Sequence, residues 1–373
     1  MILFVVGPGA GALQAPDTIG DLVSSGYRVE VILGQGTERF VGPAAFAGLA
    51  PVVEGPTEAP EALIFAPAAA GTLARLAHGL GAGSAEESYG AGVRPAVIVP
   101  ELDEATAGHP AVRENIELLR RDGCRMLEKD EEGRGVGAAE VAGAVLNSLG
   151  GPLSGMRVLV TAGGTREPVD KVRFVGNRSS GKMGRAIARE AYRRGAVVMV
   201  VAANIEVREP GVRWVDVETY AEMEEATARL AASYSDALIM AAAVSDFTPA
   251  EVVEGKIRRG SSKELELRLV ATGDIIKNVR ESNPQLFVVG FAATFGDPVA
   301  DAREKLETKS VDIVVGNDVS LAGSGFSSEE NEVHIVGRTG ENFVPRSTKK
   351  EVAGAILDAV AMEIGKERQG KHG

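Results

Sequence analysis

The sequence predicts an α/β protein built from two doubly wound domains with mostly parallel sheets. Short apolar runs alternate with amphipathic helical segments along most of the chain, a pattern typical of parallel sheets covered by helices on both faces. The chain has 373 residues, enough for two domains of ordinary size. A polar, glycine-rich stretch at residues 147–156 divides the pattern, and a new strand follows it. We therefore expect domains at residues 1–150 and 151–373.

The first domain is expected to open on a core strand. The run ILFVV has no basic segment before it, so we interpret it as a strand and not as a signal peptide. A glycine follows the last apolar position of the first helical segment, which is a typical stop signal. The further strands expected are RVEVIL, ALIFAPA and PAVIVP, and the expected helices are PDTIGDLVSSG, TLARLAHGL, AVRENIELLRRDG and GAAEVAGAVLNSLGG.

The second domain repeats this alternation. KELELRLVA alternates apolar and polar residues, which predicts a solvent-facing strand, and NEVHIVGRTGENFVPRS predicts a hairpin around RTGEN. The buried strands expected are RVLVTAG, VVMVVAA, ALIMAAAVSDF, LFVVGFAA and VDIVVGND. The expected helices are residues 181–194, residues 219–233, PVADAREKLETKS and KKEVAGAILDAVAMEIGKE.

Charge is distributed unevenly between the two halves. Residues 1–150 carry 10 lysines and arginines against 20 aspartates and glutamates, whereas residues 151–373 carry 30 against 32. An acidic chain without a basic stripe is not expected to bind nucleic acid. A polyanionic small molecule is expected to bind the second half, because only one lysine, Lys129, lies in the first.

Composition also bounds the compartment and the chemistry. No apolar run approaches the roughly 18 residues that a membrane span needs. The single cysteine, Cys124, allows no internal disulfide, which fits a reducing cytoplasm. The four histidines lack metal-ligand spacing, so a zinc site is not expected. We expect a cytoplasmic protein with neither a membrane nor a nucleic-acid partner.

The segment AGGTREPVDKVRFVGNRSSGKMG is the strongest functional signal. It follows a buried strand and precedes an amphipathic helix, an arrangement that presents backbone N–H groups to an anion. Its glycines permit close approach, and its hydroxyls can donate to phosphate oxygens. It matches neither the Walker A loop nor the dinucleotide fingerprint, and a serine-capped helix after an ordinary turn remains an alternative. The candidate phosphate-binding residues are Gly163, Gly164, Thr165, Ser179, Ser180 and Gly181.

This segment resembles the signature of phosphopantothenate–cysteine ligases, the second activity of the bifunctional bacterial coenzyme A enzymes. The resemblance covers residues 155–362 and implies a Rossmann-like domain that works as a dimer. It also implies amide formation between 4′-phosphopantothenate and cysteine through an acyl-cytidylate, with CTP and Mg²⁺. The downstream segments that follow in the family's order are AAAVSDF, GKIRR, GDII, VGFAA, AREKLETKSVDIVVGND and GFSSEENEV.

The resemblance assigns two catalytic residues. Asn177 matches the asparagine that holds the acyl-cytidylate, and Lys256 matches the lysine that stabilises charge in the second half-reaction. Arg173, in the same loop as Asn177, is expected to bind substrate. Asp246 follows an apolar strand, so it should lie at the carboxyl edge of the sheet and orient nucleotide or Mg²⁺.

Further positions are expected to contact the nucleotide. Ala242 matches a position where the backbone passes the cytosine, and Gly273 and Asp274 match the family's PDI contact, with glycine in place of proline. Phe291 matches a position that borders the nucleotide, although a core role is an alternative. One departure is Thr294, which stands where the family has a glutamate.

Two lysines have the spacing of side chains that project from the same face of a helix. Lys305 and Lys309 are four residues apart, and their charges repel each other unless an anion lies between them. A solvated face with Glu304 and Glu307 as partners is the alternative. The resemblance favours the nucleotide site.

Three segments of the first half occur in the order typical of another family: VEVILGQGTERFVGPAAFAGL, ALIFAPAAAGTLARLAHGL and HPAVRENIELLRRDGC. Through them the first half resembles the flavin-dependent decarboxylase domain that precedes this ligase. The resemblance implies a flavodoxin-like fold, but its functional residues are replaced. No histidine occurs in VVEGPTEAPEALI, and Ala70 and Asp103 stand where asparagines are expected. MLEKDEEGRG replaces the cysteine-bearing flap, and Cys124 is not that cysteine. We therefore expect a degenerate domain that has lost FMN and decarboxylation and retains an assembly role.

Other functions remain open at this stage. The chain could be a fully bifunctional decarboxylase and ligase, or a ligase for another carboxylate and amine. A subunit that binds nucleotide without turnover is disfavoured because Asn177 and Lys256 are present. An oxidoreductase is disfavoured because the dinucleotide fingerprint is absent and the flavin contacts are altered.

Overall fold

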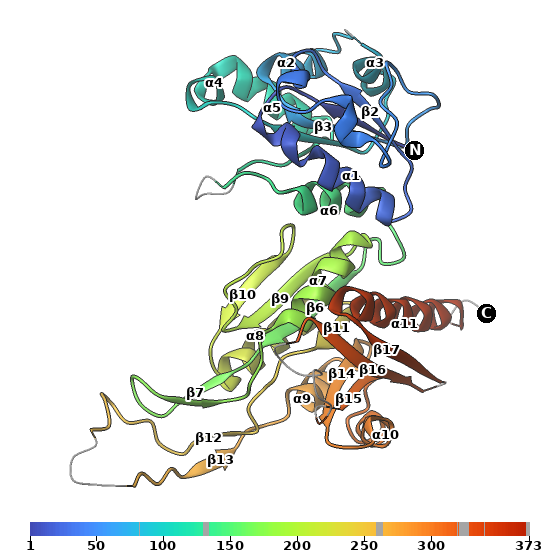
Figure 1. The fold of residues 1–373 in the computed structure, drawn as a ribbon. Coiled ribbons are helices and arrows are strands. Elements are labelled where there is room, and N and C mark those ends of the chain that lie inside the picture. Colours follow the sequence, from blue (N-terminus) through green and yellow to red (C-terminus); the bar gives the residue numbers. More distant parts are fainter. Residues whose placement is uncertain are drawn as a thin grey trace. The chain divides into compact units, whose positions relative to one another are not determined.

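The computed structural model divides the chain into two compact units, Met1–Gly151 and Pro152–Gly373 (Figure 1). The first holds a 5-stranded parallel sheet and the second an 8-stranded, mostly parallel sheet, so the predicted α/β fold class is confirmed. Within the described part of the chain, no helix is both long and apolar enough to cross a membrane. The structure describes residues 1–81, 83–129, 134–258, 264–318, 320, 328–338 and 340–370.

The sheet of the first unit is parallel throughout. Its strands are β1 (Ile2–Val6), β2 (Val29–Leu33), β3 (Ala62–Ala68), β4 (Ala96–Pro100) and β5 (Arg125–Met126). Their order in space is β2-β1-β3-β4-β5, and every residue of β3, the middle strand, is buried. The chain turns from β1 to β2 on one side and to β3 on the other. The topological switch point therefore lies between β1 and β3.

Helices cover both faces of this sheet. They are α1 (Ala15–Ser24), α2 (Ala70–Ala77), α3 (Ser84–Gly90), α4 (Glu104–Gly108), α5 (Pro110–Arg121) and α6 (Ala138–Leu149), with short turns η1 (Ala10–Gln14), η2 (Thr37–Arg39) and η3 (Pro43–Phe46). Successive side chains of β1 alternate between the faces. Phe4 packs with α1 and α6, whereas Leu3 packs with α2 and α5. All four expected helices are present, and the unexpected elements α3, α4 and β5 are each short.

The second sheet begins parallel and ends in an antiparallel hairpin. Its strands are β6 (Arg157–Gly163), β9 (Val197–Ala203), β10 (Arg213–Val217), β11 (Ala237–Met240), β14 (Phe287–Thr294), β15 (Ile313–Asp318), β16 (Glu330–Gly337) and β17 (Glu341–Thr348). Their order is β10-β9-β6-β11-β14-β15-β16-β17, and β16 pairs antiparallel with β15 and β17. The predicted hairpin is confirmed. The switch point of this sheet lies between β6 and β11.

Helices again cover both faces of the second sheet. They are α7 (Lys182–Arg193), α8 (Tyr220–Tyr234), α9 (Ile275–Ser282), α10 (Pro298–Thr308) and α11 (Lys349–Gly370). The side chains of α7 and α11 share one buried core with the sheet, and those of α8 and α9 share another. Thr219 and Glu222 form a capping box at the start of α8, which satisfies its first N–H groups.

Two predicted strands are wrong in length. The strand predicted over residues 237–247 ends at Met240, because the chain then leaves the sheet and bonds across the end of β6 through Ala243. KELELRLVA forms a strand, β13, only over Leu269–Ala271, and Lys263 lies outside the described residues. Its alternation does not reflect a sheet with one buried face, because β13 pairs only with β12 (Phe247–Pro249).

These short strands belong to an extended arm. The arm comprises two hairpins. One is β12 and β13 with the described residues between them, and the other is β7 (Arg166–Pro168) and β8 (Phe174–Gly176) with residues 169–173. Figure 1 shows it reaching away from the main sheet of its unit. The connection between the units is shorter than the predicted linker, because α6 continues to Leu149 and Leu153 is already buried in the second core.

Candidate functional site

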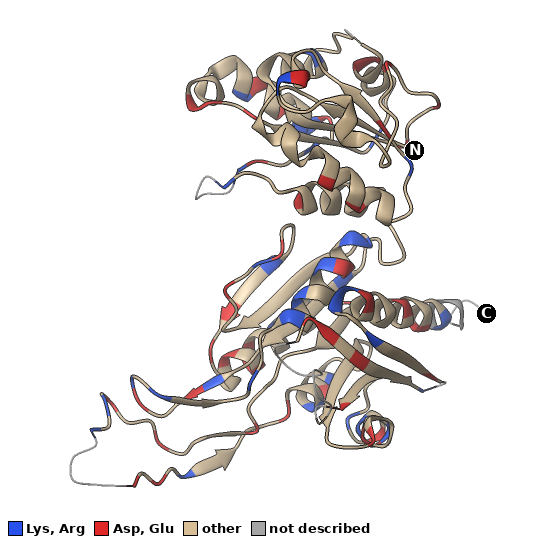
Figure 2. Cartoon of the chain, viewed as in Figure 1, with Lys and Arg blue, Asp and Glu red and all other residues tan. Residues whose placement is uncertain are grey.

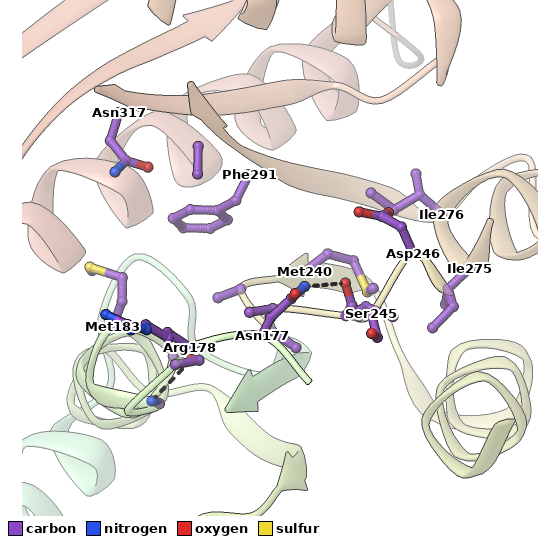
Figure 3. Close-up of a pocket in the computed structure, with 18 of the residues that line it drawn as sticks. Asn177, Arg178, Met183, Met240, Ser245, Asp246, Ile275, Ile276, Phe291 and Asn317 are labelled. Carbon is purple, nitrogen blue, oxygen red and sulfur yellow. Dashed lines mark hydrogen bonds between the residues drawn. The ribbon is translucent and has the colours of Figure 1, made fainter. Parts of the chain in front are cut away.

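A cavity of about 1030 Å³ opens at the carboxyl edge of the second sheet. Its walls come from the loop before α7, the segment after β11, the start of α9 and residues of β14, β15 and α10, at the switch point where ligands bind in open α/β sheets. Phe291 and Asn317 lie on one side of the cavity, and Asn177 and Arg178 lie on the loop opposite (Figure 3). The predicted residues that line it are Asn177, Ser179, Ser180, Gly181, Ala242, Asp246, Gly273, Asp274, Phe291, Lys305 and Lys309.

The loop before α7 is held firmly against the segment that follows β11. The Asn177 Nδ2 donates to the carbonyl of Val244 at 2.8 Å, which fixes the amide at the wall of the cavity. Gly181 caps α7 with a left-handed φ of 70°, and a Cβ there would lie 2.5 Å from the Ile205 side chain. Its N–H donates to the Ser179 hydroxyl at 3.3 Å. Residues 181–184, at the start of α7, line the cavity.

A cluster of lysines and aspartates forms the opposite end. Lys309 pairs with Asp274, and Lys305 donates to the carbonyl of Phe291. Burial lowers the pKa of Lys305, and neighbouring Lys309 lowers it further, against the opposing effect of Asp274 and Asp246. The Lys305 ammonium is therefore partly desolvated, and Lys309 lies beside it in the same cavity wall. This arrangement disagrees with the solvated-face alternative, in which nearby glutamates on the helix would be their partners.

Asp274 connects this cluster to a helix. Its carboxylate accepts from the Lys277 N–H at 3.1 Å and so caps α9. Burial alone would raise its pKa, but the hydrogen bonds from Lys309 and from Lys277 hold the pKa below its usual value. A Cβ at Gly273 would collide with the Tyr220 hydroxyl, so this glycine packs closely against the start of α8.

Five predicted site residues do not line the cavity. Gly163, Gly164 and Thr165 lie behind its wall, where the buried Thr165 hydroxyl accepts from the Ser245 N–H at 2.9 Å. Arg173 and Lys256 lie on the arm. Thr294, the departure from the family pattern, is buried and also lies outside the lining.

Asp170 anchors the part of the arm that carries Lys256. It is buried, and its carboxylate accepts from the Ile257 N–H at 2.9 Å and from the Val172 and Arg173 N–H groups at 2.7 Å. The hydrogen bond from Ile257, followed by those from Val172 and Arg173, lowers the Asp170 pKa to about 2. Arg173 pairs with Asp170 at 2.6 Å and also donates to the Ile257 carbonyl. No motif in the sequence predicted this role of Asp170.

Several polar residues that line the cavity were also missed. Lys182 pairs with Glu329, and Lys349 is buried with its pKa lowered by burial and then by neighbouring Lys182. Lys349 begins α11, where the helix dipole disfavours a cation. A lysine at the start of a predicted helix is therefore a sequence feature that could have indicated a functional role. The missed polar lining residues are Arg178, Lys182, Ser245, Thr272, Asn317, Asn331 and Lys349.

The cavity offers few metal ligands. No cluster of three or more histidine, cysteine, aspartate or glutamate side chains suited to a metal occurs among the residues described. Asp246 is a carboxylate in the wall, and Mg²⁺ is commonly held by one or two carboxylates together with substrate phosphates. Asp246 therefore fits a metal that arrives with a nucleotide.

The first unit presents different groups at its carboxyl edge. Ala70 begins α2, and Asp103 caps α4 by accepting from the Thr106 N–H at 2.7 Å, which lowers its pKa. Cys124 directly precedes β5 and so lies at the opposite, amino edge, where burial raises its pKa and its sulfur lies 3.2 Å from the Tyr89 hydroxyl. Residues 130–133 of MLEKDEEGRG lie outside the described residues.

The comparisons with known proteins cover both units. The family described as DNA/pantothenate metabolism flavoprotein C-terminal domain matches residues 153–364, and the Flavoprotein family matches residues 1–151. The coenzyme A biosynthesis bifunctional protein CoaBC of Bacillus subtilis is 33% identical and aligns with 96% of both chains. The protein of the same name from Thermococcus kodakarensis is 34% identical over 95% of this chain and 93% of its own.

The chain belongs to the CoaBC family of bifunctional coenzyme A biosynthesis proteins. A crystal structure of the C-terminal domain of a CoaBC protein is 34% identical, with a TM-score of 0.49, and covers 58% of this chain and 98% of that one. Membership of the CoaBC family confirms the predicted enzyme, a phosphopantothenate–cysteine ligase. The matches to the first unit favour a bifunctional protein over the expected degenerate domain.

Proposed function

We propose that the second unit joins 4′-phosphopantothenate to cysteine in two steps that use CTP. The substrate carboxylate attacks the α-phosphorus of CTP, forming an acyl-cytidylate and releasing pyrophosphate. The amine of cysteine then attacks the acyl carbon, CMP leaves, and the nitrogen loses a proton. The observation that carries this proposal is the convergence of a helix N-terminus, Asn177 and the Lys305–Lys309 cluster in one cavity.

The lysine cluster is suited to a triphosphate. Lys305 and Lys309 lie in a partly desolvated space in which added negative charge is stabilising. Asp274 holds Lys309 in place and provides the predicted nucleotide contact at the start of α9. Mg²⁺, held by Asp246 together with the triphosphate, would neutralise phosphate charge and improve pyrophosphate as a leaving group.

The loop before α7 is suited to the acyl-cytidylate. Ser179, Ser180 and the first turn of α7 offer hydroxyl and N–H donors to phosphate oxygens. Asn177, fixed by Val244, holds the intermediate from the same side. The backbone at Ala242 and the ring of Phe291 complete the walls near the base.

Lys256 and Arg173 act in this proposal across a homodimer. Lys256 lies outside the cavity of its own chain, on an arm that exposes many large apolar side chains. Contiguous apolar exposure of this kind marks an interaction surface. We infer that the arm packs on a second copy and brings Lys256 to the partner's cavity. The exposed apolar residues of the arm are Val172, Phe174, Phe247, Val252, Val253, Leu265, Leu267, Leu269 and Val270.

The test of the ligase is product formation. The full chain, 4′-phosphopantothenate, cysteine and Mg²⁺ are incubated with each of the four nucleotides in turn, and the products are identified by mass spectrometry. We expect phosphopantothenoylcysteine, pyrophosphate and CMP with CTP. No product with any nucleotide would overturn the proposal. Product formation only when another carboxylate or amine is supplied in place of these substrates would favour the related-ligase alternative.

Decarboxylation is the second candidate function, favoured by the matches of the first unit. We infer instead that this activity has been lost, because Ala70 and Asp103 replace the expected asparagines and the expected histidine is missing. The full chain with added FMN should then release no CO₂ from phosphopantothenoylcysteine. Release of CO₂ would establish the bifunctional alternative.

A further inference from the structure

The loop that follows β1 lies at the switch point of the first sheet. Residues 7–11 read GPGAG and connect β1 to η1 and then to α1. In doubly wound sheets with the order β2-β1-β3-β4-β5, nucleotide phosphates bind at this point, and flavin mononucleotide does so between β1 and β3. The backbone N–H groups of such a loop are the donors to the phosphate.

In this chain a carboxylate accepts those hydrogen bonds. The Ala10 N–H donates to the Glu101 Oε1 at 2.8 Å, and the Gly11 N–H donates to the Oε2 at 2.9 Å. Glu101 directly follows β4, and its own N–H donates to the carbonyl of Ala68 at 3.0 Å. The side chain is therefore placed by the ends of β3, the neighbour of β1, and of β4, the next strand in the sheet.

The glycines of the loop are packed directly against this carboxylate. A Cβ built on Gly9 would lie 2.7 Å from the Glu101 Oε2, and a Cβ on Gly11 would lie at the same 2.7 Å. Gly9 also has a φ of 157°, at the limit of what other residues adopt readily. The loop thus approaches Glu101 as closely as a phosphate-binding loop approaches its anion.

Charge in this unit also opposes a phosphate. Residues 1–150 carry twice as many acidic as basic residues, and Figure 2 shows few blue segments among them. A phosphate that entered the loop would meet the Glu101 carboxylate, and like charges placed together in an interface are strongly unfavourable.

We propose that Glu101 is a built-in anion that fills the phosphate cradle of the first unit, the Ala10 and Gly11 N–H groups, and so excludes flavin mononucleotide. The residues present therefore do not fit this cofactor. The proposal does not depend on the ligase reaction; it rests on the loss of flavin chemistry inferred above and gives that loss a physical cause.

The test compares binding of FMN and riboflavin to the full chain and its variants. Glu101→Ala empties the cradle, and Glu101→Gln removes the charge but leaves an oxygen that can accept. Glu104→Gln, three residues away in α4, is the matched control for charge. Flavin fluorescence quenching gives the affinities, and unchanged ligase turnover and circular dichroism show that the variants are folded.

We expect Glu101→Ala to bind FMN roughly 10- to 100-fold more tightly than the unaltered chain and than Glu104→Gln, since one charged hydrogen-bonding group is exchanged for the ligand's own. Glu101→Gln should show a smaller increase in FMN affinity. The affinity for riboflavin, which has no phosphate, should not change in either variant. FMN affinities within about threefold of each other, including no measurable binding by any protein, would overturn the proposal. An equal gain for riboflavin would also overturn it.

Discussion

The carboxyl edges of the two sheets share a topology and differ in chemistry. Between β1 and β3, two backbone N–H groups donate to the carboxylate of Glu101, in a unit with an excess of acidic residues. Between β6 and β11, the corresponding edge opens into a cavity of about 1030 Å³ that contains Lys305, Lys309 and the first turn of α7. The two edges therefore share a place in the fold and differ in the side chains that meet there, a carboxylate in the first unit and two lysines in the second.

The Lys256→Gln substitution should have the largest effect on the reaction at the carboxyl edge of the second sheet. A lysine that stabilises charge as the amine adds is worth roughly 10²–10³-fold in that step. The variant should release pyrophosphate once per site and then stall with acyl-cytidylate bound, which mass analysis of quenched reactions detects.

Arg258→Gln is the matched control, since it removes an exposed cation two residues away. Normal turnover by Lys256→Gln, or an equal defect in Arg258→Gln, would contradict the role of Lys256 and the partner-arm arrangement.

The Lys305→Gln substitution should slow the first step, formation of the acyl-cytidylate. It removes one of two cations from the triphosphate end, so we expect CTP to bind roughly 10- to 100-fold more weakly, without accumulated intermediate. Calorimetric titration with CTP and burst measurements of pyrophosphate check this. Lys277→Gln, an exposed lysine on α9, should leave both unchanged. Accumulation of acyl-cytidylate in Lys305→Gln would reverse the two lysine assignments.

The Asp170→Asn substitution should have a smaller effect on turnover, because Asp170 only positions the segment that carries Lys256. The neutral amide accepts the Ile257 N–H more weakly, so the segment with Lys256 is less well held and we expect turnover to fall about tenfold. Hydrogen exchange at the Ile257 amide should accelerate as turnover falls. Asp216→Asn, which breaks the exposed pair with Arg208, should change neither.

The same carboxylate predicts a pH dependence. The folded pKa of Asp170, about 2, is below its ordinary value of 3.8, so its contribution to stability is complete above about pH 4 and is lost as the pH falls toward 2. Protection of the Ile257 amide should decrease over that window in the unaltered chain. The decrease should be absent in Asp170→Asn, and an identical profile in both proteins would contradict the anchoring role.

Removal of the first unit should have the smallest effect on ligation. Residues 152–373 contain their own core, and every lining residue of the cavity belongs to them. The isolated unit should make phosphopantothenoylcysteine with CTP at close to the full-length rate. A fragment that folds and dimerises but makes no product would show that the first unit contributes to the reaction.

Local sequence patterns determined most of the elements and one wall of the site. Apolar runs of β-branched residues predicted β6, β9 and β14, because a strand buried on both faces needs continuous apolar side chains. The GNRSSGKMG loop indicated an anion site before α7, since glycine and hydroxyl residues at a helix start report local backbone geometry. The i, i+4 spacing likewise predicted that Lys305 and Lys309 converge.

Only the tertiary structure decided which groups these residues meet. The pairs Lys309–Asp274, Ile257–Asp170 and Gly11–Glu101 join positions 35, 87 and 90 residues apart, respectively. Strand order in the two main sheets brings together Lys309 with Asp274 and Gly11 with Glu101, and the packing of the two hairpins of the arm brings Ile257 to Asp170. Local periodicity specifies neither. The loop sequence alone therefore indicated one anion site, in the second unit, whereas the packing of distant strand ends placed the chain's own carboxylate at the edge of the first sheet and left the edge of the second open.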